Sequence, residues 1–206
     1  MTMPEMDAFS REAERVERTL RNIGPNDWAR PGLGEWNLAE LVVHLVRQAD
    51  LMSAYRDRPL SGATAAVDRF TYYRSAAAMA GDVAARAREA AARVDPATLP
   101  ERFAEAWRQS VDAAQAADTL IETRLGPMRT DDFAATRVVE LVVHHMDVRR
   151  ALDLPPDADP VAARIAADLL EGMLDGDRPR NLGRTRFILV ATGRARSTDP
   201  RFPVFR

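Results

Sequence analysis

The residues with the clearest potential for chemistry are three histidines, which are all the histidines in the chain. His44 follows Glu40 by four positions and His144 follows Glu140 by four, with Leu-Val-Val in each gap; His145 comes next. Residues four apart on a helix lie on one face, so Glu140 and His144 are predicted to point the same way. With His44 from a second helix they form a His, Glu, His set. Three protein ligands of this type hold a catalytic metal ion and leave one coordination position open.

Simpler interpretations of these residues stay open at this point. A single histidine beside an apolar helix face, such as His44, is more often a hydrogen-bonded core residue than a ligand. Glu140 lies among Leu and Val residues, where an isolated charge is very costly. Because the chain has no lysine, Glu140 needs an arginine, a histidine or a metal ion as its partner. His144, one turn later, is the obvious candidate.

Two neighbouring residues extend this pattern. Asp147 lies three residues after His144 and is a candidate to orient a metal-bound imidazole, which usually donates its other N–H to such a group. A salt bridge from Asp147 to Arg149 or Arg150 is an equally good interpretation. His145 points roughly 100° away from His144 around the helix. We therefore leave His145 out of the ligand set and expect it in the core or at the helix surface.

The composition excludes several kinds of chemistry. All 29 basic residues among the 206 are arginines, and cysteine is absent. A lysine Schiff base, a cysteine nucleophile, disulfides and thiolate metal sites are therefore ruled out. The net charge of -2 gives no reason to expect nucleic acid or an anionic membrane as a partner. We find neither a signal peptide nor a run of roughly 18 apolar residues, so a cytoplasmic protein is expected.

Apolar residues recur at helical spacing along most of the chain, without convincing strand alternation. Helices are predicted over approximate residue ranges 4–23, 37–56, 65–94, 101–125, 130–152, 161–174 and 184–192. Gly81 is a candidate break within the third. Asn37 with Glu40 is predicted to form a capping box, and Thr130-Asp131-Asp132 is predicted to cap the fifth helix. The apolar run from residue 187 to 191 fits a strand equally well.

Helices joined mostly by short connections indicate an all-α antiparallel bundle, in which ligand sites form between facing helices. Three prolines in Leu154–Pro160 break the chain after the fifth helix. We therefore expect a metal-binding four-helix bundle over residues 1–155. A C-terminal helical extension over residues 156–206 should pack on it and end in an irregular tail from Arg194 to Arg206.

Taken together, these motifs resemble a known family. The turn Gly34-Glu35-Trp36-Asn37, then His44-Leu45, then Glu140-Leu-Val-Val-His-His-Met-Asp147, resembles the DinB superfamily. More narrowly, the chain is similar to the mycothiol-dependent maleylpyruvate isomerase family and its N-terminal domain. The resemblance runs from the first helix to about Leu152. The segment Ala191-Thr192-Gly193-Arg194 is also similar to the one that closes many members.

The resemblance implies a DinB-like four-helix bundle that binds a divalent metal, most often zinc, through His44, Glu140 and His144. It also implies a low-molecular-weight thiol as cosubstrate, mycothiol in actinobacteria, which agrees with the absence of cysteine here. A thiol bound to a metal is deprotonated at neutral pH. The thiolate then attacks a small electrophile, as in a thiol S-transferase or an isomerase. Asp147 and Arg194 are the expected catalytic residues.

Isomerases of this family carry a further C-terminal domain that supplies a catalytic arginine, whereas only a short tail follows the helices here. Arginine suits bidentate contact with a substrate carboxylate, and Arg184, Arg186 and Arg194 are the candidates. We therefore expect thiol S-transfer rather than isomerisation. Two other functions stay open: a non-catalytic metal-binding or thiol-sensing bundle, and a metal-dependent hydrolase. A monomer and a homodimer are both compatible with the sequence.

Overall fold

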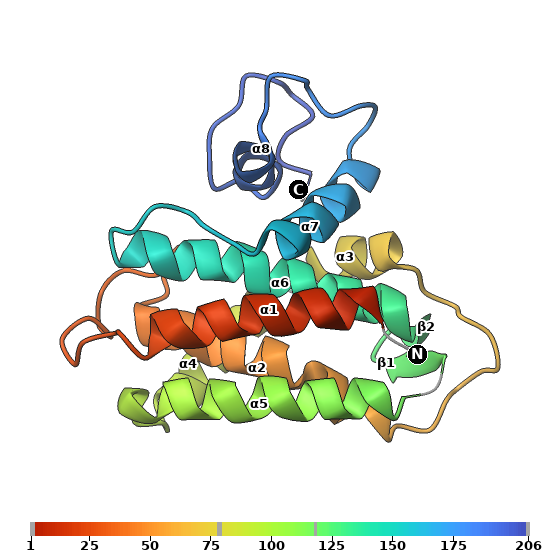
Figure 1. Cartoon of the computed structure of the whole chain (residues 1–206), viewed down its shortest axis with the longest axis horizontal. Helices are drawn as coiled ribbons and strands as arrows, with labels where there is room; N and C mark the ends of the chain where they lie inside the picture. Colours follow the sequence, from red (N-terminus) through yellow and green to blue (C-terminus); the bar gives the residue numbers. More distant parts are fainter. Residues whose placement is uncertain (1–2, 78–79, 118, 205–206) are drawn as a thin grey trace.

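Four long helices packed side by side form the body of the molecule (Figure 1). They are α1 (Pro4–Leu20), α2 (Leu38–Arg56), α5 (Leu99–Gln115) and α6 (Thr130–Ala151). The computed structural model describes residues 3–77, 80–117 and 119–204. Both α1 and α2 pack on α5 and on α6. The predicted all-α bundle is confirmed by this arrangement.

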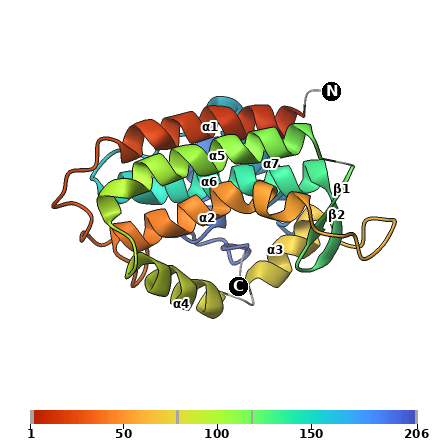
Figure 2. The ribbon, with the colours of Figure 1, turned by 90° about the horizontal axis from the view of Figure 1, so that it is seen from below.

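The long connection between α2 and α5 sets the directions of the four helices. α1 and α6 start at the end of the bundle where two short strands lie, and α2 and α5 start at the opposite end (Figure 1, Figure 2). α1 and α2 are therefore antiparallel, as are α5 and α6, while α2 and α5 run the same way. A four-helix bundle with one long crossover connection has this kind of arrangement.

The apolar spacing predicted for the first helix places its side chains in the core. Phe9, Ala13, Val16 and Leu20 of α1 are all buried. α6 differs, because it is buried on nearly all sides by the helices around it. The ionisable side chains in the middle of α6, between residues 137 and 147, therefore lie largely inside the protein and need partners there.

The loop before α2 is held by side-chain and backbone hydrogen bonds. The Asn37 side chain accepts a hydrogen bond from the Glu40 N–H at 2.9 Å, and the Glu40 carboxylate accepts one from the Asn37 N–H at 2.8 Å. This is the predicted capping box. The Gly32 N–H donates to the Trp36 carbonyl oxygen at 2.8 Å, and a Cβ at position 32 would lie 2.7 Å from the Asn37 carbonyl oxygen. Glycine is thus required at this turn, which carries Trp36 to the start of α2.

The segment predicted as one helix over residues 65–94 contains two helices. α3 (Arg69–Ala77) packs on α6, and α4 (Ala80–Ala91) packs on α2. The two point in different directions (Figure 2). The predicted break at Gly81 falls inside α4, and residues 78–79 lie outside the described part of the chain. A single 3-10 turn, η1 (Pro96–Thr98), then leads into α5.

A β-hairpin replaces the end of the helix predicted over residues 101–125. Strand β1 (Leu120–Thr123) pairs antiparallel with β2 (Gly126–Arg129), and Thr123 lies opposite Gly126. The connection between them therefore has two residues, the length that tight hairpin turns favour. β-branched residues on β1 and the φ of +111° at Gly126 favour a hairpin over a continued helix.

The start of α6 also differs from the prediction. Arg129 is the N-cap residue and its side chain makes no capping hydrogen bond. Thr130, Asp131 and Asp132 lie in the first turn of the helix instead of before it. Two carboxylates in the first turn still interact favourably with the positive end of the helix dipole.

Two shorter helices follow α6. α7 (Pro160–Gly172) packs on α1 and α6, and α8 (Arg184–Ala191) packs on α7 (Figure 1). The apolar run from residue 187 to 191 is therefore helical, and the described tail residues 194–204 contain neither helix nor strand. The division of the chain at residue 155 stays a prediction. Among the helices described, none has the length and apolar character needed to cross a membrane.

Candidate metal centre

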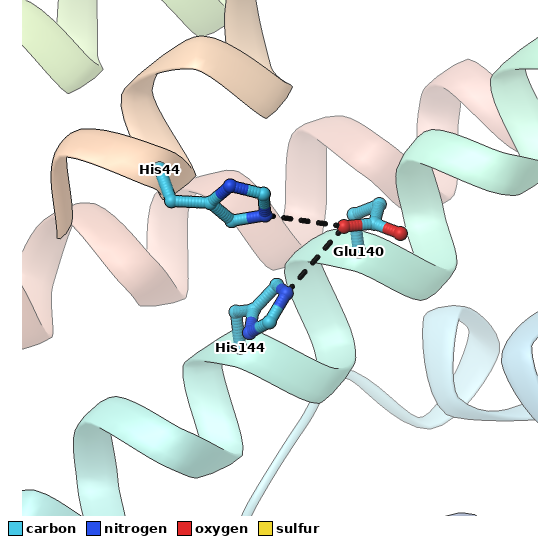
Figure 3. A group of neighbouring side chains, drawn as sticks. All are labelled: His44, Glu140 and His144. Atoms are coloured by element: carbon cyan, nitrogen blue, oxygen red, sulfur yellow. Dashed lines mark ion pairs between the residues drawn. The ribbon is translucent and has the colours of Figure 1, made fainter. Parts of the chain in front are cut away.

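The three residues of the predicted ligand set meet at the interface of α2 and α6 (Figure 3). His44 comes from α2, and Glu140 and His144 lie one turn apart on α6. The Nε2 atoms of both histidines lie 3.5 Å from Oε2 of Glu140. One ligand atom from each residue lies within 4.8 Å of those of the other two. Both histidines are buried, and the side chain of Glu140 is 19% exposed.

Hydrogen bonds leave Nε2 of each of these histidines as an acceptor. Nδ1 of His144 lies 3.0 Å from the Asp147 carboxylate, which only accepts, so the proton of a neutral ring is on Nδ1. Nε2 of His44 lies 3.1 Å from the amide nitrogen of Gln48. The Gln48 oxygen accepts a hydrogen bond from Arg137, which fixes the amide with its N–H toward His44. Nε2 is therefore the unprotonated nitrogen of both neutral rings, and in both it lies 3.5 Å from Oε2 of Glu140.

This geometry fits a metal ion. Two imidazole lone pairs and a carboxylate oxygen converge, and none of the three is a donor. Their approach is unfavourable unless a cation, either a proton or a metal ion, lies between them. Metal–ligand bonds of about 2.0–2.2 Å at tetrahedral angles separate ligand atoms by roughly 3.4 Å. The two separations of 3.5 Å agree with this value, and the donor set suits zinc and other divalent first-row metals.

Burial and mutual contacts set the charges of the three groups. Burial alone would raise the pKa of Glu140, but the neighbouring imidazoles of His144 and His44 hold its pKa well below the usual value. Burial would lower the pKa of His144, yet its hydrogen bond with Asp147 and the neighbouring carboxylate of Glu140 raise its pKa. Burial lowers the pKa of His44, and Glu140 offsets this only in part. Glu140 is therefore an anion at neutral pH, which is the charge that a divalent cation favours.

Tyr73 holds the second carboxylate oxygen of Glu140, a contact that sequence reasoning missed. Its hydroxyl lies 3.1 Å from Oε1 of Glu140 and 2.8 Å from the backbone oxygen of Thr136. Burial raises the pKa of Tyr73 well above its usual value, so the phenol is a neutral donor. Tyr73 thereby keeps Oε2 of Glu140 toward the histidines. No motif marks Tyr73, because the contact joins two helices far apart in sequence.

Asp147 makes both of the contacts that were predicted as alternatives. Its carboxylate lies 3.0 Å from Nδ1 of His144 and forms an ion pair with Arg150 at 3.2 Å. Arg194, from the segment after α8, donates three hydrogen bonds of 2.8 to 3.2 Å to the same carboxylate. Arg149 donates to a backbone oxygen instead. Arg194 therefore acts on the site through Asp147.

His145 faces away from the site and is a core residue. Its Nδ1 lies 2.6 Å from the Glu12 carboxylate, and its Nε2 lies 2.9 Å from the Thr19 hydroxyl. Both ring nitrogens therefore have protein partners. The other Glu12 oxygen accepts a hydrogen bond from the Asp159 N–H at 2.6 Å, which ties α1 to the start of α7. These contacts agree with the prediction that His145 is not a metal ligand.

A cavity of about 720 Å³ opens beside the three residues, which lie in its wall. Its volume is within the range of pockets that bind small molecules. Apolar side chains of α2, α4 and α6 form much of the lining. Trp36, from the turn before α2, also lines it and lies 5.2 Å from the ring of His44. The site is thus a polar group in a mostly apolar pocket.

Arginines supply most of the charge in this cavity. Five of them line it: Arg47, Arg86, Arg124, Arg137 and Arg194. Of the three arginines predicted near its mouth, Arg194 lines the cavity. Arg184 and Arg186 are exposed and are not among the described residues of the lining.

Two polar residues of the site were overlooked although helix spacing marks them. Arg137 lies three residues before Glu140, and Gln48 lies four residues after His44. Each is therefore on the same helix face as a predicted ligand. The helical spacing of three or four residues that marks the predicted ligands therefore also marks Arg137 and Gln48.

Comparison with known proteins agrees with the motifs. A family model described as the mycothiol maleylpyruvate isomerase N-terminal domain matches residues 9–149, more than half of the chain. No curated protein matches the sequence. The fold resembles a solved structure described as the mycothiol-dependent maleylpyruvate isomerase, with 13% identity and a TM-score of 0.53, over 83% of this chain and 72% of that one. The resemblance inferred from the motifs is confirmed: the chain belongs to the mycothiol maleylpyruvate isomerase N-terminal domain family.

Proposed function

We propose that this protein is a metal-dependent enzyme in which a low-molecular-weight thiol, mycothiol, attacks a small electrophile. His44, Glu140 and His144 hold the divalent ion in this proposal. The observation that carries it is the convergence of two imidazole lone pairs and one carboxylate in the wall of a 720 Å³ cavity. Three protein ligands leave a coordination position for the thiol. Membership of the family supports mycothiol as that thiol.

The chain's own residues prepare the site for this chemistry. When bound, the ion lowers the pKa of a thiol, so that the thiolate is available at neutral pH. Asp147, held by Arg194, keeps Nε2 of His144 toward the site. Tyr73 does the same for Oε2 of Glu140. The apolar walls of the cavity limit water, which strengthens the electrostatic interactions inside.

The reactive sulfur comes with the cosubstrate, because the chain contains no cysteine. In S-transfer, a carbon–sulfur bond forms, the leaving group departs with its electron pair, and the thiol proton goes to solvent. In isomerisation, the thiol adds across a carbon–carbon double bond, the resulting single bond rotates, and the thiol is eliminated again. Both reactions need the same thiolate, and we propose S-transfer as the reaction of this chain.

Zinc is the ion that we propose, because the ligand types and the 3.5 Å separations suit it.

The cytoplasm is the proposed compartment. We also propose that residues 1–155 form the metal-binding bundle and residues 156–206 a helical extension. The packing of α7 on α1 and α6 supports an extension that is fixed to the bundle.

Turnover of a chromogenic electrophile tests the proposal. Zinc-loaded protein is mixed with the electrophile, with and without mycothiol, and the products are identified by mass spectrometry. We expect turnover that requires both zinc and thiol and yields a thioether. Turnover without thiol would favour a metal-dependent hydrolase. Bound zinc without turnover in any condition would favour a metal-binding or thiol-sensing bundle.

A further inference from the structure

Arg137 is an unusual residue in this cavity, because it is a buried cation with which no carboxylate of the described residues forms an ion pair. It lies on α6 at 3% exposure. Its Nε and Nη2 donate to the Thr136 hydroxyl at 3.1 and 3.0 Å, and its Nη1 donates to the Gln48 side-chain oxygen. Arg137 forms no ion pair with a carboxylate in the described part of the chain. Burying an unpaired charge is costly, so such a residue points to a ligand that completes the pairing.

The guanidinium of Arg137 is also held in a fixed plane. Its central carbon lies 4.9 Å from the ring centre of Phe133 and 5.6 Å from that of Tyr72. A guanidinium has five N–H donors, and the contacts within the described residues use three of them. One N–H group on Nη1 and one on Nη2 are therefore left for an oxyanion, and arginine can bind a planar oxyanion through two such groups.

The other arginines of the cavity are less suited to this task. Arg194 already donates three hydrogen bonds to Asp147. Arg47, Arg86 and Arg124 are exposed, so water screens their charge. Arg137 alone combines deep burial, a fixed orientation and a place beside the proposed ligands.

We propose that Arg137 determines the specificity of this cavity by binding the carboxylate of an anionic electrophile. The inference rests on the proposed function and adds the substrate class and the residue that selects it. Arg137 precedes Glu140 by three residues, which corresponds to about 4.5 Å along the helix axis. The carboxylate and the carbon that the thiolate attacks should therefore be a few bonds apart in the substrate.

A matched pair of electrophiles tests this inference. In 4-chloro-3,5-dinitrobenzoate and its methyl ester, the thiolate displaces chloride: a carbon–sulfur bond forms and the carbon–chlorine bond breaks. The wild-type protein with zinc and mycothiol should have the lower KM for the acid. Arg137→Met should raise the KM for the acid by about 10- to 100-fold, the loss expected for a charged hydrogen-bonded pair, and change the KM for the ester far less. Equal effects on acid and ester would overturn the inference.

Two controls separate specificity from damage to the fold. Arg137→Lys keeps the charge but not the fork, so the KM for the acid should fall between those of wild type and Arg137→Met. Arg124→Met removes an exposed arginine of the same cavity and should leave the preference for the acid intact. Equal preference loss in Arg124→Met would show that general charge, and not Arg137, selects the substrate.

A binding measurement keeps this inference separate from the proposed function. Isothermal titration of the acid into zinc-loaded protein without thiol should show binding that weakens by the same factor in Arg137→Met. If neither electrophile turns over but this binding depends on Arg137, the proposed reaction fails and the anion site stands. If binding of the acid is absent, or is the same in wild type and variant, the anion site fails whatever the outcome of the kinetics.

Discussion

Two adjacent histidines on α6 have opposite surroundings. His144 pairs with Asp147 through Nδ1 at 3.0 Å and presents Nε2 to Glu140 beside the cavity. His145 uses both ring nitrogens for protein contacts, with Glu12 at 2.6 Å and with Thr19 at 2.9 Å. Each histidine is buried and each has a carboxylate neighbour, so residue type does not distinguish them.

The two histidines differ in whether a ring nitrogen remains available to bind a ligand. His145 has no nitrogen available for a ligand, so its contacts tie α1 to α6 and contribute to stability. His144 keeps an Nε2 lone pair directed at two other acceptor atoms. Side chains of adjacent residues on a helix point roughly 100° apart, so His144 faces the cavity and His145 faces the core.

Removal of His144 should abolish metal binding. His144→Ala takes away one of three ligands, so the metal content should fall from about one ion per chain to nearly none, as measured by elemental analysis. Helix content, measured by circular dichroism, should stay largely intact. His44→Ala should behave in the same way, and Glu140→Gln should weaken binding by removing the anionic ligand. Unchanged metal content in both histidine variants would defeat the assignment.

Removal of His145 should lower the stability of the fold and leave metal binding intact. His145→Ala leaves the fully buried Glu12 carboxylate without its imidazole, so the free energy of unfolding should fall by about 3–5 kcal/mol. Urea denaturation measures this loss. The folded fraction of the variant should still bind one ion. Metal loss from a His145→Ala protein that stays fully folded would show that the two histidines do not have separate roles.

Asp147 should affect the metal affinity only through its contact with His144. Asp147→Asn removes the anionic acceptor of the Nδ1 proton, and such changes typically weaken metal affinity by about 10- to 100-fold. Competition with a chromophoric chelator measures the change. Arg150→Met is the matched control, because Arg150 contacts the same carboxylate from a half-exposed position. An affinity of Asp147→Asn equal to that of wild type would remove Asp147 from the site.

The smallest expected effect belongs to Tyr73. Tyr73→Phe removes one hydrogen bond to Glu140 and should weaken metal affinity by about 3- to 10-fold, the value of a single neutral donor. The same chelator assay measures it. Tyr72→Phe is the control, since the ring of Tyr72 packs on Phe133 and the substitution keeps that ring. A larger effect in Tyr72→Phe than in Tyr73→Phe would contradict the role given to Tyr73.

Some features could be predicted because they depend on residues close together in the chain. The capping box of Asn37 and Glu40 spans three residues, and the shared face of Glu140 and His144 spans four. The hairpin over residues 120–129 was missed, although its β-branched residues and Gly126 are also local signals. The helix predicted over residues 101–125 covers the first strand because apolar residues continue at helical spacing up to Leu125.

Sequence alone determined the four long helices of the bundle except for the end of the one before the hairpin, the capping box, the common face of Glu140 and His144 and the exclusion of cysteine and lysine chemistry. These features follow from local geometry and composition. Only the tertiary structure decided the placement of His44 against that face, the orientation of Glu140 by Tyr73 and the burial of Arg137. Those contacts join helices far apart in the chain. They depend on how the helices pack and turn against one another, which helical periodicity leaves undetermined.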